Sequence, residues 1–321
     1  MKKFKFLSLV MILIILLTAG CSKISNEDAQ NTSFENLSEE KIKFVTSFYP
    51  IYIMMLNITD GASGVEVVNM SETHTGCLHD FQIQPEDLKN IETSTAFIIN
   101  GAGMEPFVEK ILQENPNIKI VDSSKGIELI LSDGHENHSH EEEEEEDHHH
   151  EYNPHIWVSI SNYIQQIENI TDEIINLDPN NADIYELNCN TYIKNLEQLS
   201  SQMHEKIDNL PNKNIVTFHE AFPYFAKEFS LNVVGVINQN PHSKPSAKEI
   251  ADTINKIKQN NVKALFVEPQ YLDNLAENIA SETNSQIFVL DPAVTGDKSK
   301  DCYINTMRKN MQTLVEALSH S

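Results

Sequence analysis

Short apolar runs rich in β-branched or aromatic residues alternate with amphipathic stretches along most of this chain. In the first half, strands are predicted at residues 42–48, 65–68, 96–100 and 118–121, and helices at 52–58, 84–91 and 105–115. Strands that alternate with helices through short connections indicate a parallel sheet with right-handed crossovers. The first half is therefore predicted to form an α/β lobe.

The same pattern returns in the second half. Strands are predicted there at residues 214–218, 233–237, 262–267 and 286–290, and helices at 222–229, 246–259, 272–283 and 303–318. Between the halves, residues 159–177 and 179–210 are helical in pattern, and Pro179 suits a helix start. We predict two α/β lobes with parallel sheets, at 41–177 and 211–321, joined by a long linking helix at 178–210.

The N-terminus has the features of a signal peptide. Three lysines precede an apolar run at residues 6–17, followed by Thr18-Ala19-Gly20-Cys21. This pattern resembles a bacterial lipobox, which implies removal of residues 1–20 and lipidation of Cys21. Residues 21–40 are polar and are expected to be a disordered tether. The mature chain is thus expected at the outer face of the cytoplasmic membrane. The alternative is an uncleaved N-terminal anchor helix, which would also place the folded chain outside the cytoplasm.

Charge and cysteine content narrow the classes of partner. The formal net charge of −25 argues against nucleic acid, because phosphate backbones are held by clustered Lys and Arg. Ten of the carboxylates lie within residues 133–151, so the charge of the folded surface is less extreme. After lipidation of Cys21, three cysteines would remain, so at most one internal disulfide can form. They are Cys77, Cys189 and Cys302.

Four potential metal ligands stand at predicted strand ends or in the loops that follow. They are His79, His155, His219 and Asp291. In open α/β sheets ligands bind at the carboxyl ends of strands, and a cleft between two lobes gathers several of these ends. Three imidazoles and a carboxylate can fill a tetrahedral zinc site, and nitrogen donors favour zinc over magnesium or calcium. A metal site is therefore predicted in the interlobe cleft.

The motifs around these residues closely resemble those of the zinc and manganese substrate-binding lipoproteins of ABC importers, the ZnuA-like family. The motifs are His79-Asp80-Phe81, Asn100-Gly101-Ala102-Gly103, Asn153-Pro154-His155-Ile156-Trp157, His219-Glu220-Ala221-Phe222, Glu268-Pro269-Gln270 and Leu290-Asp291-Pro292. The resemblance covers almost the whole mature chain. It implies a monomeric, non-enzymatic zinc-binding protein whose partner is the membrane permease of an ABC importer.

The same resemblance implies how the ligands divide between the lobes. His79 and His155 would come from the N-terminal lobe, and His219 and Asp291 from the C-terminal lobe. Manganese-binding members carry Glu at the position that matches His219, so Zn2+ is expected and Mn2+ is the alternative. Asp80 and Glu268 are carboxylates that can accept the remaining ring N–H of a ligating imidazole.

The chain departs from the family pattern at residues 72–78, where relatives often have a proline directly before the ligand histidine. This departure brings His74 and Cys77 close to the predicted site. Each is either an additional ligand or a nearby residue without a metal role, and a thiolate suits zinc.

A low-complexity loop rich in histidine and acidic residues occupies residues 133–151. Its histidines are His135, His138, His140, His148, His149 and His150. The composition cannot form a packed core, so this segment is predicted to be disordered. Similar loops occur in zinc-binding relatives, which implies an auxiliary metal collector. The alternative is a solvated linker.

Two other classes of function compete with metal delivery. A metalloenzyme is one, but His219-Glu220-Ala221-Phe222-Pro223 has proline where a zinc-protease motif needs its second histidine. A surface adhesin is the other, and the sequence has no repeat, exposed aromatic cluster or coiled coil that would favour it.

Overall fold

The computed structural model describes residues 41–71, 76–78, 81–132, 152–237, 245–270 and 274–319. The predicted signal peptide, Cys21, the tether and the histidine-rich loop lie outside these residues. Within the described ranges, no helix combines the length and apolar character needed to cross a membrane.

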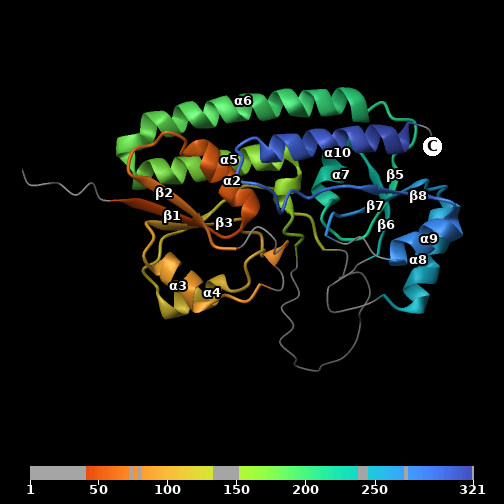
Figure 1. The fold of residues 1–321 in the computed structure, drawn as a ribbon, viewed down its shortest axis with the longest axis horizontal. Helices are drawn as coiled ribbons and strands as arrows, with labels where there is room; N and C mark the ends of the chain where they lie inside the picture. The colour runs from red at the N-terminus through yellow and green to blue at the C-terminus, as the bar shows by residue number, and fades with distance from the viewer. Residues whose placement is uncertain are drawn as a thin grey trace, which may run out of the picture. The chain divides into compact units, whose positions relative to one another are not determined.

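The N-terminal lobe contains a parallel four-stranded sheet of order β2-β1-β3-β4 (Figure 1). Its strands are β1 (Ile42–Thr46), β2 (Val65–Asn69), β3 (Ala96–Ile99) and β4 (Ile120–Asp122), and its helices are α2 (Tyr49–Ile58), α3 (Pro85–Glu92) and α4 (Val108–Glu114). Phe44 and Phe97 are fully buried. Burial of such β-branched and aromatic strand residues is the main favourable contribution to this lobe's stability.

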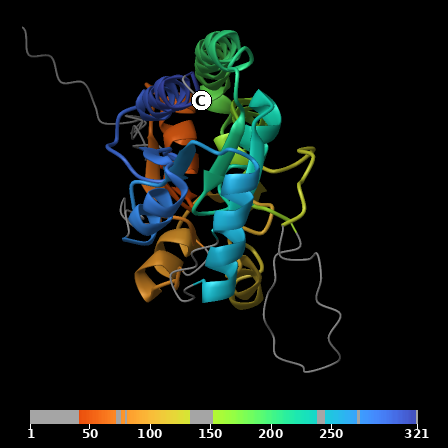
Figure 2. The same cartoon turned by 90° about the vertical axis from the view of Figure 1, so that its right-hand side faces the viewer.

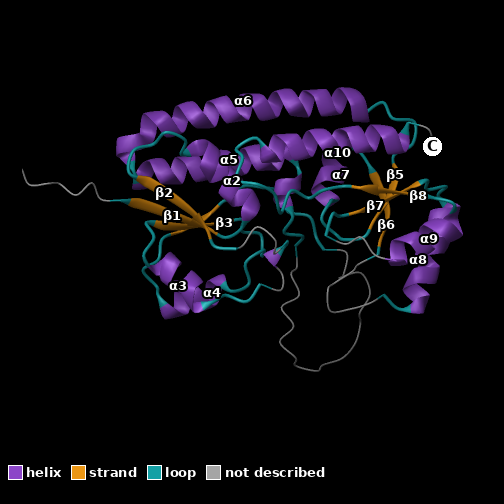
Figure 3. Ribbon diagram, in the orientation of Figure 1, coloured by secondary structure: helices purple, strands orange, loops and turns teal. Residues whose placement is uncertain are grey.

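The C-terminal lobe repeats this arrangement. Its parallel sheet has the order β6-β5-β7-β8, so in each lobe the first strand lies between the second and the third. The strands are β5 (Asn214–Thr217), β6 (Asn232–Val236), β7 (Ala264–Val267) and β8 (Gln286–Val289), with helices α7 (Pro223–Phe229), α8 (Ala247–Gln259) and α9 (Asn274–Thr283). Figure 3 shows the two sheets as separate groups of strands. The predicted pair of parallel α/β lobes is thus confirmed.

Three long helices link the lobes. They are α5 (Ile160–Leu177), α6 (Ala182–Ile207) and α10 (Cys302–Leu318). The α5 helix buries Ile160, Tyr163, Ile167, Ile170 and Ile174, which recur at the three- and four-residue spacing of one helix face. The 26 residues of α6 span roughly 39 Å at 1.5 Å per residue. Seen nearly end-on in Figure 2, α6 and α10 lie side by side.

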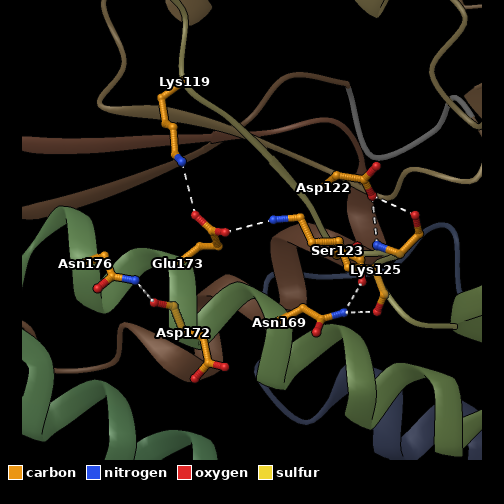
Figure 4. A network of polar contacts seen from close by, with 9 residues as sticks. Lys119, Asp122, Ser123, Lys125, Asn169, Asp172, Glu173 and Asn176 are labelled. Atoms are coloured by element: carbon orange, nitrogen blue, oxygen red, sulfur yellow. Dashed lines mark hydrogen bonds and ion pairs between the residues drawn. The ribbon is translucent and has the colours of Figure 1, made fainter.

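Polar contacts attach α5 to residues on both sides of β4 (Figure 4). Glu173 pairs with Lys119 at 3.1 Å and with Lys125 at 2.8 Å. Asn169 donates its two amide hydrogens to the carbonyls of Ser123 and Lys125, both at 2.8 Å. These contacts fix the helix against β4, from which the chain continues toward the site.

The two lobes share buried contacts. Trp157, the only tryptophan of the chain, is fully buried and donates from Nε1 to the carbonyl of Pro292 at 2.7 Å. Tyr303 donates to the carbonyl of Trp157 at 2.8 Å, and Tyr49 donates to the carbonyl of Asp297 at 2.6 Å. One hydrophobic core includes side chains from both sheets and from all three linking helices. The segment that follows β8 is thereby held against the N-terminal lobe.

Candidate metal centre

Three side chains with metal-binding atoms come together between the lobes. Cys77 lies in the loop after β2, His155 lies directly before the 3-10 helix η3 (Ile156–Val158), and His219 follows β5. Their ligand atoms all lie within 4.8 Å of one another. The rings of His155 and His219 meet edge to face, with centroids 4.8 Å apart and an interplanar angle of 86°. Two nitrogen donors and one sulfur donor at such a spacing form a candidate site for a transition metal.

His155 is buried and is oriented by its own sequence motif. The Oδ1 atom of Asn153 lies 3.0 Å from both the backbone nitrogen and Nδ1 of His155. Pro154 stands between them, so the Asn-Pro-His sequence closes a turn through the asparagine side chain. The ring of Trp157 packs at a centroid distance of 5.2 Å on His155 and limits its movement.

His219 is oriented by a carboxylate. Its Nδ1 lies 2.8 Å from Oε1 of Glu268, which follows β7 and has a side chain only 3% exposed. Burial lowers the pKa of His219, but the charge and hydrogen bond of Glu268 outweigh it, so the pKa is raised above 6.5. A carboxylate that accepts the Nδ1 hydrogen of an imidazole is the usual support of a metal-binding histidine. Glu268 is therefore placed where a carboxylate can accept the remaining ring N–H of a ligating histidine.

Cys77 is half-buried, and its thiol lies among the two imidazoles. Burial raises the pKa of this thiol well above its usual range, and the charge of Glu268 raises it further. In the absence of metal the group is therefore a neutral thiol. Cys77, Cys189 and Cys302, the three cysteines within the described part of the chain, are all free. No disulfide competes for the sulfur of Cys77 among them.

Asp291 follows β8 at the carboxyl end of the second sheet. Its Oδ1 accepts from the backbone nitrogen of Ala293 at 2.8 Å, and its backbone nitrogen donates to Asn310 at 2.9 Å. Burial raises the pKa of its carboxyl, against that hydrogen bond, and nearby Glu268 adds to the rise. Among the described residues, the close group comprises Cys77, His155 and His219 without Asp291. Its role as a ligand stays a prediction.

Several predicted site residues fall outside the described part of the chain. They are His74, His79, Asp80 and the histidines of residues 133–151. Their predicted roles stay predictions. Of the four expected ligands, His155 and His219 are therefore brought together, with Cys77 as a third member whose role the sequence left open.

Sequence reasoning did not identify the residues that connect the two histidines. Asn153 also donates from Nδ2 to the carbonyl of Glu220 at 2.8 Å, beside His219. Tyr224 donates to the carbonyl of Asn153 at 2.7 Å and accepts from the backbone nitrogen of Ile130 at 3.0 Å. The Asn-Pro pair before His155 was the only local signal, because an Asn side chain commonly bonds to the backbone two residues on.

Comparison with known proteins gives consistent relatives. The high-affinity zinc uptake system protein ZnuA of Bacillus subtilis is 31% identical over 310 residues, which cover 94% of each chain. The zinc-binding protein AdcA of Streptococcus pyogenes is 29% identical over 87% of this chain, which spans only 56% of that protein. The manganese-binding lipoprotein MntA of Halalkalibacterium halodurans is 25% identical over 99% of this chain and all of its own length.

A solved structure agrees with these relatives. The substrate-binding protein FpvC of Pseudomonas aeruginosa, in complex with Mn2+, superimposes with a TM-score of 0.75 at 27% identity, over 88% of this chain and 99% of its own. Residues 44–317 also match the family described as zinc-uptake complex component A, periplasmic. This family comprises solute-binding proteins, in agreement with the prediction of a non-enzymatic function. The chain therefore belongs to the ZnuA family of metal-binding, substrate-binding proteins of ABC transporters.

Proposed function

We propose that this chain is an extracytoplasmic zinc-binding protein that delivers the ion to an ABC importer. The observation that carries this function is the group of Cys77, His155 and His219, whose ligand atoms lie within 4.8 Å of one another. Imidazole and thiolate donors suit zinc, whereas magnesium and calcium prefer shells of oxygen. The relatives from Bacillus subtilis and Streptococcus pyogenes, both named for zinc, support the same metal.

Manganese is the alternative cargo. The Halalkalibacterium relative is named for manganese, and the FpvC structure holds Mn2+. Manganese prefers carboxylate, carbonyl and water oxygens, while softer nitrogen and sulfur donors favour zinc. The described donors of this chain are two nitrogens and one sulfur, which is why we favour zinc.

Capture would begin with a neutral thiol and two oriented imidazoles. Zinc would displace the proton of Cys77, since only the thiolate is a good metal ligand. His79 and Asp291 are the residues that the family resemblance adds to the shell. Ligands from both lobes would make the ion a bridge between them, so that binding favours the closed arrangement and release requires their separation.

The partner and the location follow from the family and the N-terminal pattern. We infer a monomer attached through lipidated Cys21 to the outer face of the membrane, where it meets the permease of its importer. The relatives from Halalkalibacterium halodurans and Streptococcus pneumoniae that are named lipoproteins support this anchor. The histidine-rich loop at 133–151 would collect additional zinc with lower affinity.

Competitive titration of the metal-free mature protein with zinc and manganese tests this function. The variants are His219→Ala and a deletion of residues 133–151. His204→Ala is a matched control, because His204 also pairs with a carboxylate, that of Asp208 at 3.0 Å, but on the exposed surface of α6. We expect one tight zinc site that is lost in His219→Ala, kept in His204→Ala and kept in the loop deletion.

The competing outcomes are distinct. Manganese binding as tight as zinc binding would assign the chain to manganese. Tight zinc binding that survives His219→Ala would place the metal elsewhere. Loss of the tight site in the loop deletion would make the loop, and not the interlobe group, the main site.

A further inference from the structure

Asn153 is buried, and each of its backbone and side-chain polar groups makes a hydrogen bond. Its backbone nitrogen donates to the carbonyl of Ile130 at 2.8 Å, and its own carbonyl accepts from Tyr224. Its side chain accepts from His155 and donates to the carbonyl of Glu220. With 1% of its surface exposed, Asn153 connects the segment of one histidine of the site to the segment of the other.

The orientation of the Asn153 amide is determined by its partners. A carbonyl oxygen can only accept, so the atom that faces Glu220 must be the amide nitrogen. The backbone N–H of His155 can only donate, so the atom that faces it must be Oδ1. Both contacts would be repulsive if the amide were rotated by half a turn.

This orientation determines the tautomer of His155. Oδ1 of Asn153 cannot donate, so Nδ1 of a neutral His155 ring at 3.0 Å must carry the hydrogen. The lone pair of the ring is then on Nε2, which is the form that can bind a metal through that nitrogen. Glu268 imposes the same arrangement on His219, where Nδ1 lies 2.8 Å from the carboxylate. The Asn153 amide thus sets the tautomer of His155, and the Glu268 carboxylate sets that of His219.

We propose that Asn153 is a positioning residue for metal capture, which holds His155 in its Nδ1–H tautomer and ties it to the His219 turn across the lobes. This role rests on the proposed function insofar as the metal is concerned. Preorganisation matters because a ligand that must rotate or change tautomer before binding lowers affinity. Loss of a group that supports a metal ligand typically reduces metal affinity about 10- to 100-fold.

The test compares three variants of the mature protein. Asn153→Ala removes both the acceptor and the donor, and Asn153→Asp keeps an acceptor for His155 while it loses the donor to Glu220. Asn169→Ala is the control, because it removes two similar amide hydrogen bonds, to Ser123 and Lys125, away from the site. Circular dichroism establishes which variants are folded under the conditions of the assay.

Two readouts separate positioning from structural support. Nitrogen chemical shifts of the His155 ring, measured in metal-free protein in mildly alkaline buffer, report the tautomer directly. Competition with a chromophoric chelator gives the zinc dissociation constant. We expect the Nδ1–H tautomer in the wild type, Asn153→Asp and Asn169→Ala, and its loss in Asn153→Ala. Zinc affinity should fall about 10- to 100-fold in Asn153→Ala, recover in part in Asn153→Asp and stay unchanged in Asn169→Ala.

The failures of the two proposals can be told apart. If the wild type binds no metal, the proposed function is wrong, and the tautomer measurement still tests the role of Asn153. If wild-type protein binds zinc but Asn153→Ala keeps both its tautomer and its affinity, Asn153 is not a positioning residue. An equal loss of affinity in Asn169→Ala would show that the effect comes from general destabilisation, which also overturns the inference.

Discussion

Gly296 lies where the segment after β8 passes close to the N-terminal lobe. A Cβ atom added at this glycine would stand 2.4 Å from Oη of Tyr49 and 2.6 Å from Sγ of Cys302. Tyr49 is 2% exposed and donates to the carbonyl of Asp297, so its hydroxyl has no free path away from the added carbon. Gly296→Ala is therefore expected to push the segment away from α2.

The magnitude follows from two contributions. Overpacking of a well-packed site costs about 1–3 kcal/mol. Loss of the hydrogen bond from Tyr49 to Asp297 adds about 1 kcal/mol. The free energy of unfolding should thus fall by about 2–4 kcal/mol in Gly296→Ala. Gly235→Ala is the matched control, since a Cβ at Gly235 in β6 meets nothing within 4 Å and should change stability by less than about 1 kcal/mol.

Urea unfolding of chelator-treated protein measures the difference without a contribution from bound metal. Fluorescence of Trp157 is a suitable probe, because this single tryptophan bonds across the lobes to Pro292. A free energy of unfolding for Gly296→Ala within about 0.5 kcal/mol of the wild type, the usual range of a neutral surface change, would refute the close packing of this segment on α2.

Three further predictions concern titration and metal release. Burial raises the pKa of Glu105 to about 7, although the hydrogen bonds that Asn100 and Gly101 donate to its carboxylate oppose this rise. The folded form therefore binds the proton more tightly than the unfolded form. As a result, the free energy of unfolding should fall as pH rises from about 4.5 to 7. The fall from this group is at most roughly 3 kcal/mol, and urea titrations of metal-free Glu105→Gln at both ends of that range should show it reduced. Zinc binding should release about one proton fewer in Cys77→Ala than in the wild type, as measured by calorimetry in buffers of different ionisation enthalpy, and equal release would exclude Cys77 as a ligand. Glu268→Gln removes the charge that raises the pKa of His219 against the effect of burial. Because protons compete with zinc below that pKa, the loss of zinc affinity on acidification should begin at lower pH in this variant. An unchanged dependence of zinc affinity on pH between about 5 and 8 would contradict the pairing of His219 with Glu268.

The helices and strands could be predicted because their hydrophobic periodicity is local. Their first and last residues were harder to predict, because individual side-chain contacts determine where an element begins and ends. The helix predicted from Glu105 begins at Val108, since the Glu105 carboxylate instead accepts from the backbone nitrogens of Asn100 and Gly101. The helix predicted at 179–210 forms its first residues as a 3-10 turn over Pro179–Asn181 and ends at Ile207. Proline suits this start, because the N–H that it lacks has no partner within the first turn of a helix.

The candidate site was predictable only in part, because its geometry arises from contacts far apart in sequence. His155 and His219 were identified by their positions at strand ends and by family motifs. Cys77 was expected near the site because it lies two residues before His79, but the sequence did not show that its sulfur would lie within 4.8 Å of both imidazoles. The link from Asn153 to Glu220 spans 67 residues and is likewise a product of tertiary structure.

The shared core constrains how such a site can open. Relative motion of domains is limited when their interface is large and hydrophobic. Here one hydrophobic core includes Phe97 of the first sheet, Phe266 of the second and Trp157 between them, all buried. A wide swing of one lobe would expose this core, and a large displacement of the loops that carry Cys77 and His219 would expose Leu78 and Phe222, which belong to it. We therefore expect the separation of the lobes that releases the metal to be small, with the linking helices and most of the shared core unchanged.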